Sequence, residues 1–115
     1  MSSEAVKALR IAAGSLKRTT KELLAYRAEK ETNEVKIRGM KEAGADVHDI
    51  RQQQNVLNET LMMLPDCTKR LQGTLEHTYE AVDNYGREVG DDCEQLAAAK
   101  AAIEAAQEAL GDEAE

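Results

Sequence analysis

The feature that most constrains the fold is a run of apolar residues at alternating three- and four-residue spacing in the middle of the chain. The register does not slip over the whole run, which comprises Val47, Ile50, Gln54, Leu57, Leu61, Leu64, Thr68, Leu71, Leu75, Thr78, Val82 and Tyr85. This spacing is typical of a helix that packs in a coiled-coil-like seam. It predicts one helix over residues 46–85, about 60 Å long, with Asp46 as its N-cap.

Two less regular patterns flank this run. The first, over residues 3–43, has an apolar seam that fails at Arg27 and Lys30, resumes at Ile37 and is expected to stop at Gly44. The second, over residues 91–110, is rich in alanine and is expected to be capped by Asp91 or Asp92. Its sevenfold set is Val89, Leu96, Ile103 and Leu110. Residues 111–115 are predicted to be an acidic tail.

Together these patterns predict an all-α fold, an elongated antiparallel three-helix bundle with up-down-up order. The chain has 115 residues, so it is expected to form a single domain. It contains one Pro, no Phe, no Trp and three Tyr, which excludes a β-sandwich and an aromatic-lined small-molecule pocket. Because the first two helices outrun the third, part of their seam is expected to stay uncovered and available to a partner.

Pro65 lies inside the longest predicted helix and is expected to kink it, because it cannot donate a hydrogen bond to the carbonyl of Leu61. The kink either lets the helix wrap its neighbours or shapes a binding surface, and the two interpretations are compatible. Met62 and Met63 fall off the seam beside it, and with Val56 they form an outer apolar patch unless another helix covers them.

Charge is distributed unevenly along the chain. The net charge is −7, yet the first third is basic, with Lys7, Arg10, Lys17, Arg18 and Lys21 on the outer face of the first helix around Ile11. An acidic chain with one basic face is a poor nucleic-acid binder, so this face is either solvated or docks an acidic protein. No apolar stretch is long enough to span a membrane.

The sequence offers little for catalysis. His48 and His77 are too far apart to share a site on one helix, and Cys67 has no base three or four residues away. Arg70 could favour the Cys67 thiolate, but a cation alone does not make a catalytic site. Two cysteines, Cys67 and Cys93, fit a reducing cytosol better than a disulfide framework. We therefore expect no enzyme, no metal and no cofactor.

The string Met62-Met63-Leu64-Pro65-Asp66-Cys67, followed by Arg70-Leu71, resembles the central helix of the tubulin-binding cofactor A family. The resemblance covers roughly residues 9–85 and does not include the alanine-rich third segment. It implies a small three-helix chaperone in the cytoplasm, associated with the cytoskeleton, that captures β-tubulin on the pathway to the α/β heterodimer. By position match, the candidate partner-binding residues are Lys17, Arg18, Lys21, Tyr26, Met62, Met63, Pro65, Asp66, Cys67 and Arg70.

A second hypothesis is a self-assembling coiled-coil module with a structural or adaptor role, because the heptad run is so regular. The sequence does not distinguish a monomer from a homodimer. Partners other than protein are not expected.

Overall fold

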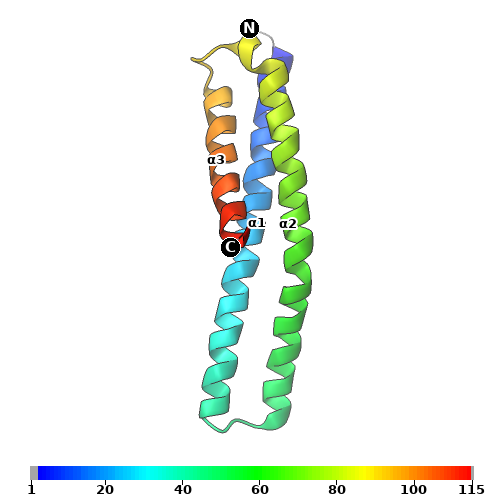
Figure 1. Ribbon diagram of the computed structural model, residues 1–115, viewed down its shortest axis with the longest axis vertical. Helices are drawn as coiled ribbons and strands as arrows, with labels where there is room; N and C mark the ends of the chain where they lie inside the picture. Colours follow the sequence, from blue (N-terminus) through cyan, green and yellow to red (C-terminus); the bar gives the residue numbers. More distant parts are fainter. Residues whose placement is uncertain (1–2, 115) are drawn as a thin grey trace.

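The computed structural model describes residues 3–114, which form three helices. They are α1 (Ser3–Glu42), α2 (Val47–Val89) and α3 (Glu94–Ala114). Figure 1 shows α1 and α2 running antiparallel along the full length of a rod, with α3 alongside only the end that carries the N-terminus. The rod measures 64 × 22 × 17 Å. The predicted all-α, up-down-up bundle is confirmed.

The connection between α1 and α2 closes with specific hydrogen bonds. The amide of Gly44, whose φ is 71°, bonds to the carbonyl of Lys41, and that of Ala45 bonds to the carbonyl of Met40. This pair of bonds is a Schellman motif, which requires a residue with positive φ and explains the glycine. Asp46 caps α2 by accepting a hydrogen bond from the amide of His48 at 2.7 Å, as its sequence position predicted.

The second connection lies later in the chain than expected. Helix α2 continues through Gly86 and ends only at Gly90, whose φ is 79°. The amide of Cys93 then bonds back to the carbonyl of Gly90, and Cys93 in turn accepts from the amide of Ala97. This turn places Asp91 and Asp92 outside the helix, so the expected cap by one of them is not used. Helix α3 runs on to Ala114, and Glu115 of the predicted acidic tail lies outside the described residues.

The hydrophobic core occupies one half of the rod. Its two clusters draw on all three helices and end at Tyr26 on α1 and Leu64 on α2. On α3 the core is largely a stripe of small residues, namely Ala99, Ala102, Ala106 and Ala109. Small side chains let α3 approach α1 and α2 closely. We call residues 3–26 with 64–114 the three-helix half, and residues 27–63 the two-helix half.

The two-helix half buries little. Among the described residues only Asn33, Ile37 and Thr60 are buried there. Two predicted seam residues are largely exposed, Val47 at 67% and Leu61 at 40% of their surface. Their predicted burial was wrong because α3 ends before it reaches them, while the expectation of an uncovered seam is confirmed.

Pro65 lies close to the boundary between the halves, one residue inside the three-helix half, between the core residues Leu64 and Cys67. The helix is continuous through it, although Pro65 has no amide hydrogen for the carbonyl of Leu61. The kink at Pro65 stays a prediction.

Candidate partner-binding surface

Helix α1 presents the basic part of the candidate surface. Lys17, Arg18 and Lys21 are exposed, and the Arg18 guanidinium donates to the Ser15 hydroxyl at 3.2 Å. Tyr26 differs from these three, because it is half-buried and packs against the core. The α1 contribution is therefore three accessible cations and one aromatic side chain that is only partly accessible.

Helix α2 presents the apolar part. Met62 has 75% of its surface exposed and Val56 is exposed beside it, whereas Met63 is half-buried. Pro65, Asp66 and Arg70 are exposed on the same stretch of helix. An exposed methionine on a surface otherwise suited to charged side chains is adaptable and can fit an irregular partner.

Cys67 occupies a different position from the other candidates. Only 1% of its surface is exposed, and it belongs to the core cluster with Leu71 and Leu23. Its side chain therefore supports the surface from beneath and is not placed to touch a partner. The heptad pattern missed this burial because Cys67 lies one position off the seam, next to Thr68.

A residue that the sequence reasoning missed, Glu22, joins the two helices. Its carboxylate forms an ion pair with the Arg70 guanidinium and accepts a hydrogen bond from the Cys67 thiol at 3.5 Å. Arg70 also donates to the Cys67 sulfur at 3.5 Å. Glu22 is the one acidic residue between Glu4 and Glu29, and this isolation in a basic stretch is the signal that could have identified it.

These contacts determine the state of the thiol. Burial raises the pKa of Cys67, and the neighbouring Glu22 carboxylate raises it further, while Arg70 opposes both. Arg70 therefore favours the thiolate, as expected, but burial and Glu22 outweigh its effect on the Cys67 pKa. Cys67 is a neutral thiol at pH 7, unsuited to nucleophilic chemistry.

The ion pair also shows which residues of α1 and α2 lie at the same level of the rod. Lys21 precedes Glu22, so it lies at the level of Arg70, and Met62 lies eight residues earlier on α2, about 12 Å away along the helix. A shallow depression formed by α1 and α2 alone extends the surface in the other direction. It is lined by Ile11, 52% exposed, and by His77, Glu80 and Tyr85 among others.

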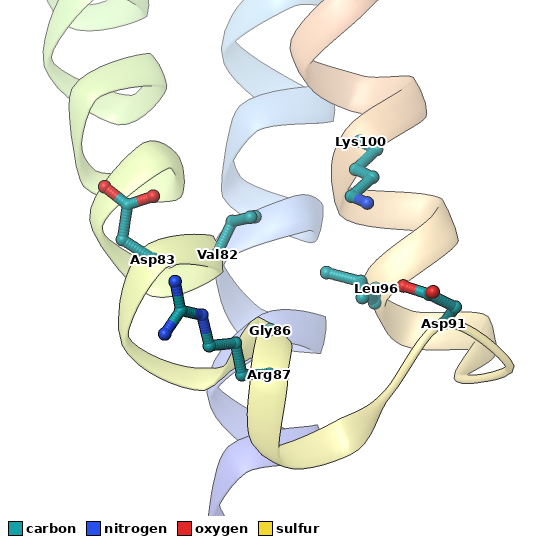
Figure 2. Close-up of a pocket in the computed structure, with 7 residues that line it drawn as sticks. All are labelled: Val82, Asp83, Gly86, Arg87, Asp91, Leu96 and Lys100. Atoms are coloured by element: carbon teal, nitrogen blue, oxygen red, sulfur yellow. The ribbon is translucent and has the colours of Figure 1, made fainter.

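A separate depression lies at the end of the rod where α2 turns into α3. Figure 2 shows Val82 and Leu96 at its base, with Asp83 and Arg87 on α2, Asp91 in the connection and Lys100 on α3 around it. Its two positive and two negative side chains cancel, so the depression has no net charge to select an ion. None of the candidate residues lines it.

The described residues contain no group of three or more His, Cys, Asp or Glu side chains placed to hold a metal ion. None of the three helices, as far as they are described, is long and apolar enough to cross a membrane.

Comparison with known proteins identifies a family that this chain matches. A family model described as "Tubulin binding cofactor A" matches residues 4–103, which includes ten residues of α3. A curated relative, "Tubulin-folding cofactor A" of Arabidopsis thaliana, is 46% identical over 61% of this chain and 62% of its own length. The relative "Tubulin-specific chaperone A" of Homo sapiens is 32% identical over 73% of this chain and 78% of its own.

Solved structures show the same architecture. The crystal structure of tubulin folding cofactor A from Arabidopsis thaliana superposes with a TM-score of 0.81 at 33% identity, covering 91% of this chain and 97% of that one. The crystal structure of tubulin-binding cofactor A from Leishmania major gives 0.77 at 26% identity, covering 95% and 99%. Both matches cover far more of the chain than residues 9–85, the part that carried the resemblance in sequence.

Proposed function

Because the chain belongs to the tubulin binding cofactor A family, we propose that it captures β-tubulin released from the cytosolic chaperonin. It holds this client in a quasi-native form and passes it along the pathway that builds the α/β heterodimer. The cofactor uses no nucleotide, metal or covalent chemistry. It works in the cytoplasm and is associated with the cytoskeleton through its client.

The observation that carries the proposal is that exposed cations on α1 and an exposed apolar patch on α2 occupy neighbouring levels of the rod. Lys17, Arg18 and Lys21 suit an acidic client such as tubulin, since opposite charge speeds association and excludes wrong partners. Met62 supplies apolar area that a solvated helix does not need. The Glu22–Arg70 ion pair joins the two helices between these two parts.

The mechanism is selective binding. A protein that binds one state of its client stabilises that state by mass action, by an amount set by its concentration relative to its dissociation constant. An extended rigid rod suits this role, because the helices are formed before the client arrives and little ordering entropy is lost on binding.

The test is capture of β-tubulin from a cytosolic extract by the wild-type chain and by Arg18→Glu with Lys21→Glu. We expect the double variant to lose at least tenfold in capture, with an unchanged circular dichroism spectrum. Arg87→Glu with Lys100→Glu changes the net charge equally at the opposite end of the three-helix half, and it should bind like the wild type. Undiminished capture by the first variant would show that the basic face is not used.

Met62→Gln separates the apolar contribution from the charges. Met62 is exposed, so the substitution leaves the fold intact, and we expect weaker capture of β-tubulin in the same assay. Equal capture of α- and β-tubulin by the wild-type chain would contradict the proposed client specificity and leave family membership untouched.

A further inference from the structure

Helices α1 and α2 continue as a pair beyond the end of α3, which leaves the path of α3 uncovered (Figure 1). On α1 this path is marked by Leu24, which lines a depression together with Ala105 and Ala109 of α3. Val35 lies eleven residues after Leu24, about three helical turns, and so on the same face. It has 55% of its surface exposed because α3 has ended before this level.

On α2 the face that meets α3 is marked by Tyr79, whose hydroxyl accepts a hydrogen bond from the Gln107 amide of α3. Leu61 lies about five turns before Tyr79 and Val47 about nine turns before it. Both therefore continue this face, and both are exposed. We call the strip with Val35 on α1 and with Leu61 and Val47 on α2 the uncovered groove.

The uncovered groove continues the surface on which α3 already packs. Between Val47 and Leu61, the half-buried Ile50 and Leu57 extend the apolar strip along α2. An extended segment would find no backbone hydrogen-bond partners on two helices, whereas a helix satisfies its own backbone. About 13 residues of α1, or roughly 20 Å, lie beyond the end of α3, so the groove fits an amphipathic helix of three to four turns.

Charges on the α1 wall of the groove determine which way such a helix runs. Glu31 and Glu34 lie toward α3, and Arg38 and Lys41 lie toward the α1–α2 connection, all lining one shallow depression with Val35. Within the described residues none of these four charges is in an ion pair. They favour a helix whose anionic side chains lie toward the connection and whose cationic side chains lie toward α3.

This charge order also suits the dipoles of the helices. Acidic residues stabilise a helix N-terminus and basic residues a C-terminus, so the N-terminus of the docked helix lies toward the α1–α2 connection. Its cationic end then meets the C-terminal end of α3, where the negative end of the α3 dipole lies.

We propose that an amphipathic helix of the client, β-tubulin, docks in the uncovered groove in the orientation that these charges define. The inference rests on the proposed function and names the kind of client segment that is held. A subunit that has not yet joined its permanent partner leaves the apolar surface of that interface exposed, and this is surface that the groove can cover. Because the contact is short, it adds to the binding by the cations of α1 and by Met62 and does not replace it.

Exchanging two charges on α1 tests the docking and its orientation. Glu34→Arg together with Arg38→Glu reverses the charge order, keeps the net charge and alters only exposed side chains. We expect this variant to capture β-tubulin from cytosolic extract at least fivefold less well than the wild type, with an unchanged circular dichroism spectrum. Glu29→Arg together with Lys36→Glu makes the same exchange at exposed positions on the opposite face of α1, and it should capture like the wild type.

A photo-cross-linker identifies the occupant of the groove. Val35→Cys labelled with benzophenone maleimide places the probe in the groove, while the native Cys67 and Cys93 stay unlabelled because they are buried. We expect a cross-link to β-tubulin, within a segment that has apolar residues at three- and four-residue spacing and acidic residues toward its N-terminus. The same label on Glu29→Cys should give no cross-link.

The possible outcomes distinguish failure of this docking from failure of the proposed function. A wild-type chain that captures no β-tubulin overturns the proposed function and the docking together. A wild-type chain that captures β-tubulin no better than the variant exchanged at Glu34 and Arg38 overturns the docking alone. The docking is also overturned if position 35 gives no cross-link, or if it cross-links to a second copy of this chain or to a β-tubulin segment without helical spacing.

Discussion

The two halves of the rod use the same two helices and differ in what covers them. In the three-helix half, Leu9, Leu16 and Leu23 on α1 are fully buried, because α2 and α3 enclose them together. In the two-helix half the equivalent stretch of α1 carries charged residues such as Lys30, and its buried positions are Asn33 and Ile37. Two helices alone cannot enclose an apolar seam. Apolar residues are therefore buried mainly along the length of the rod that α3 covers.

A core substitution should cost far more unfolding free energy in the three-helix half than in the two-helix half. Leu71 is fully buried in the three-helix half, so Leu71→Ala should cost about 2–5 kcal/mol in the free energy of unfolding. Leu61→Ala removes the same atoms from a 40%-exposed site in the two-helix half and should cost less than about 1 kcal/mol. Urea unfolding followed by circular dichroism measures both. Equal costs would show that the two halves are equally well packed.

Pro65 lies at the boundary, and replacing it should couple the halves more tightly. Pro65→Ala restores an amide donor for the carbonyl of Leu61 and removes the crowding of the ring, which should stabilise the chain by up to about 3 kcal/mol. We also expect greater helicity and weaker capture of β-tubulin. A loss of thermal stability would instead mean that the predicted bend is needed to pack the bundle.

Asn33 is a buried polar residue of the two-helix half, where a substitution is expected to raise stability. Its amide nitrogen is buried and has no hydrogen-bond partner among the described residues. A buried donor without a partner lowers the free energy of unfolding by about 1–3 kcal/mol. Asn33→Leu should therefore raise the free energy of unfolding by a similar amount. Hydrogen exchange should then slow over residues 28–62, while Asn58→Leu, at an exposed position, leaves exchange unchanged. Faster exchange in Asn33→Leu would indicate that the amide has a partner in solution.

The smallest effect concerns the ionisation of Cys67 in the three-helix half. Its pKa is raised in the folded chain by burial and by Glu22, whereas an unfolded thiol titrates near about 8.5. The stabilisation is therefore complete below that pH and is lost as pH rises through the folded pKa, because the unfolded state releases its proton first. Cys67→Ala should flatten the alkaline decline in unfolding free energy relative to the wild type. Parallel declines in both chains would rule out this contribution.

The long-range regularity of the fold was readable from the sequence because it depends on spacing. The seam of α2, the Asp46 cap and the Gly44 turn all follow from local chemistry, as does the stripe of small residues on α3. The Asp91 cap was wrong because the turn from Gly90 to Cys93 competes with it. Val47 and Leu61 follow the heptad rule perfectly, and only the length of a third helix, a tertiary property, decides that they are exposed.

The exposed residues of the candidate surface were predictable from the sequence, but the contacts between its two helices were not. Charge runs identified Lys17, Arg18 and Lys21, and off-seam methionines identified Met62. The contact among Glu22, Arg70 and Cys67 joins two helices 45 to 48 residues apart in sequence, so no local pattern could show it. Arg27 is a second example. In the sequence it only interrupts the apolar seam, but in the fold its guanidinium donates to the carbonyl of Ala109 at 2.7 Å.

That last contact has a consequence for where α3 sits along its neighbours. A stripe of alanines is nearly smooth, so it holds the helices together without deciding their axial offset. The offset is defined at the two ends instead. At one end Leu96 packs over Gly86, with its methyl at ordinary contact distance, 3.5 Å, from where a Cβ would lie. At the other end Arg27 reaches the backbone of Ala109. A slide of one turn, about 5.4 Å, would lose both contacts at once, so these two contacts help to specify the axial position of α3.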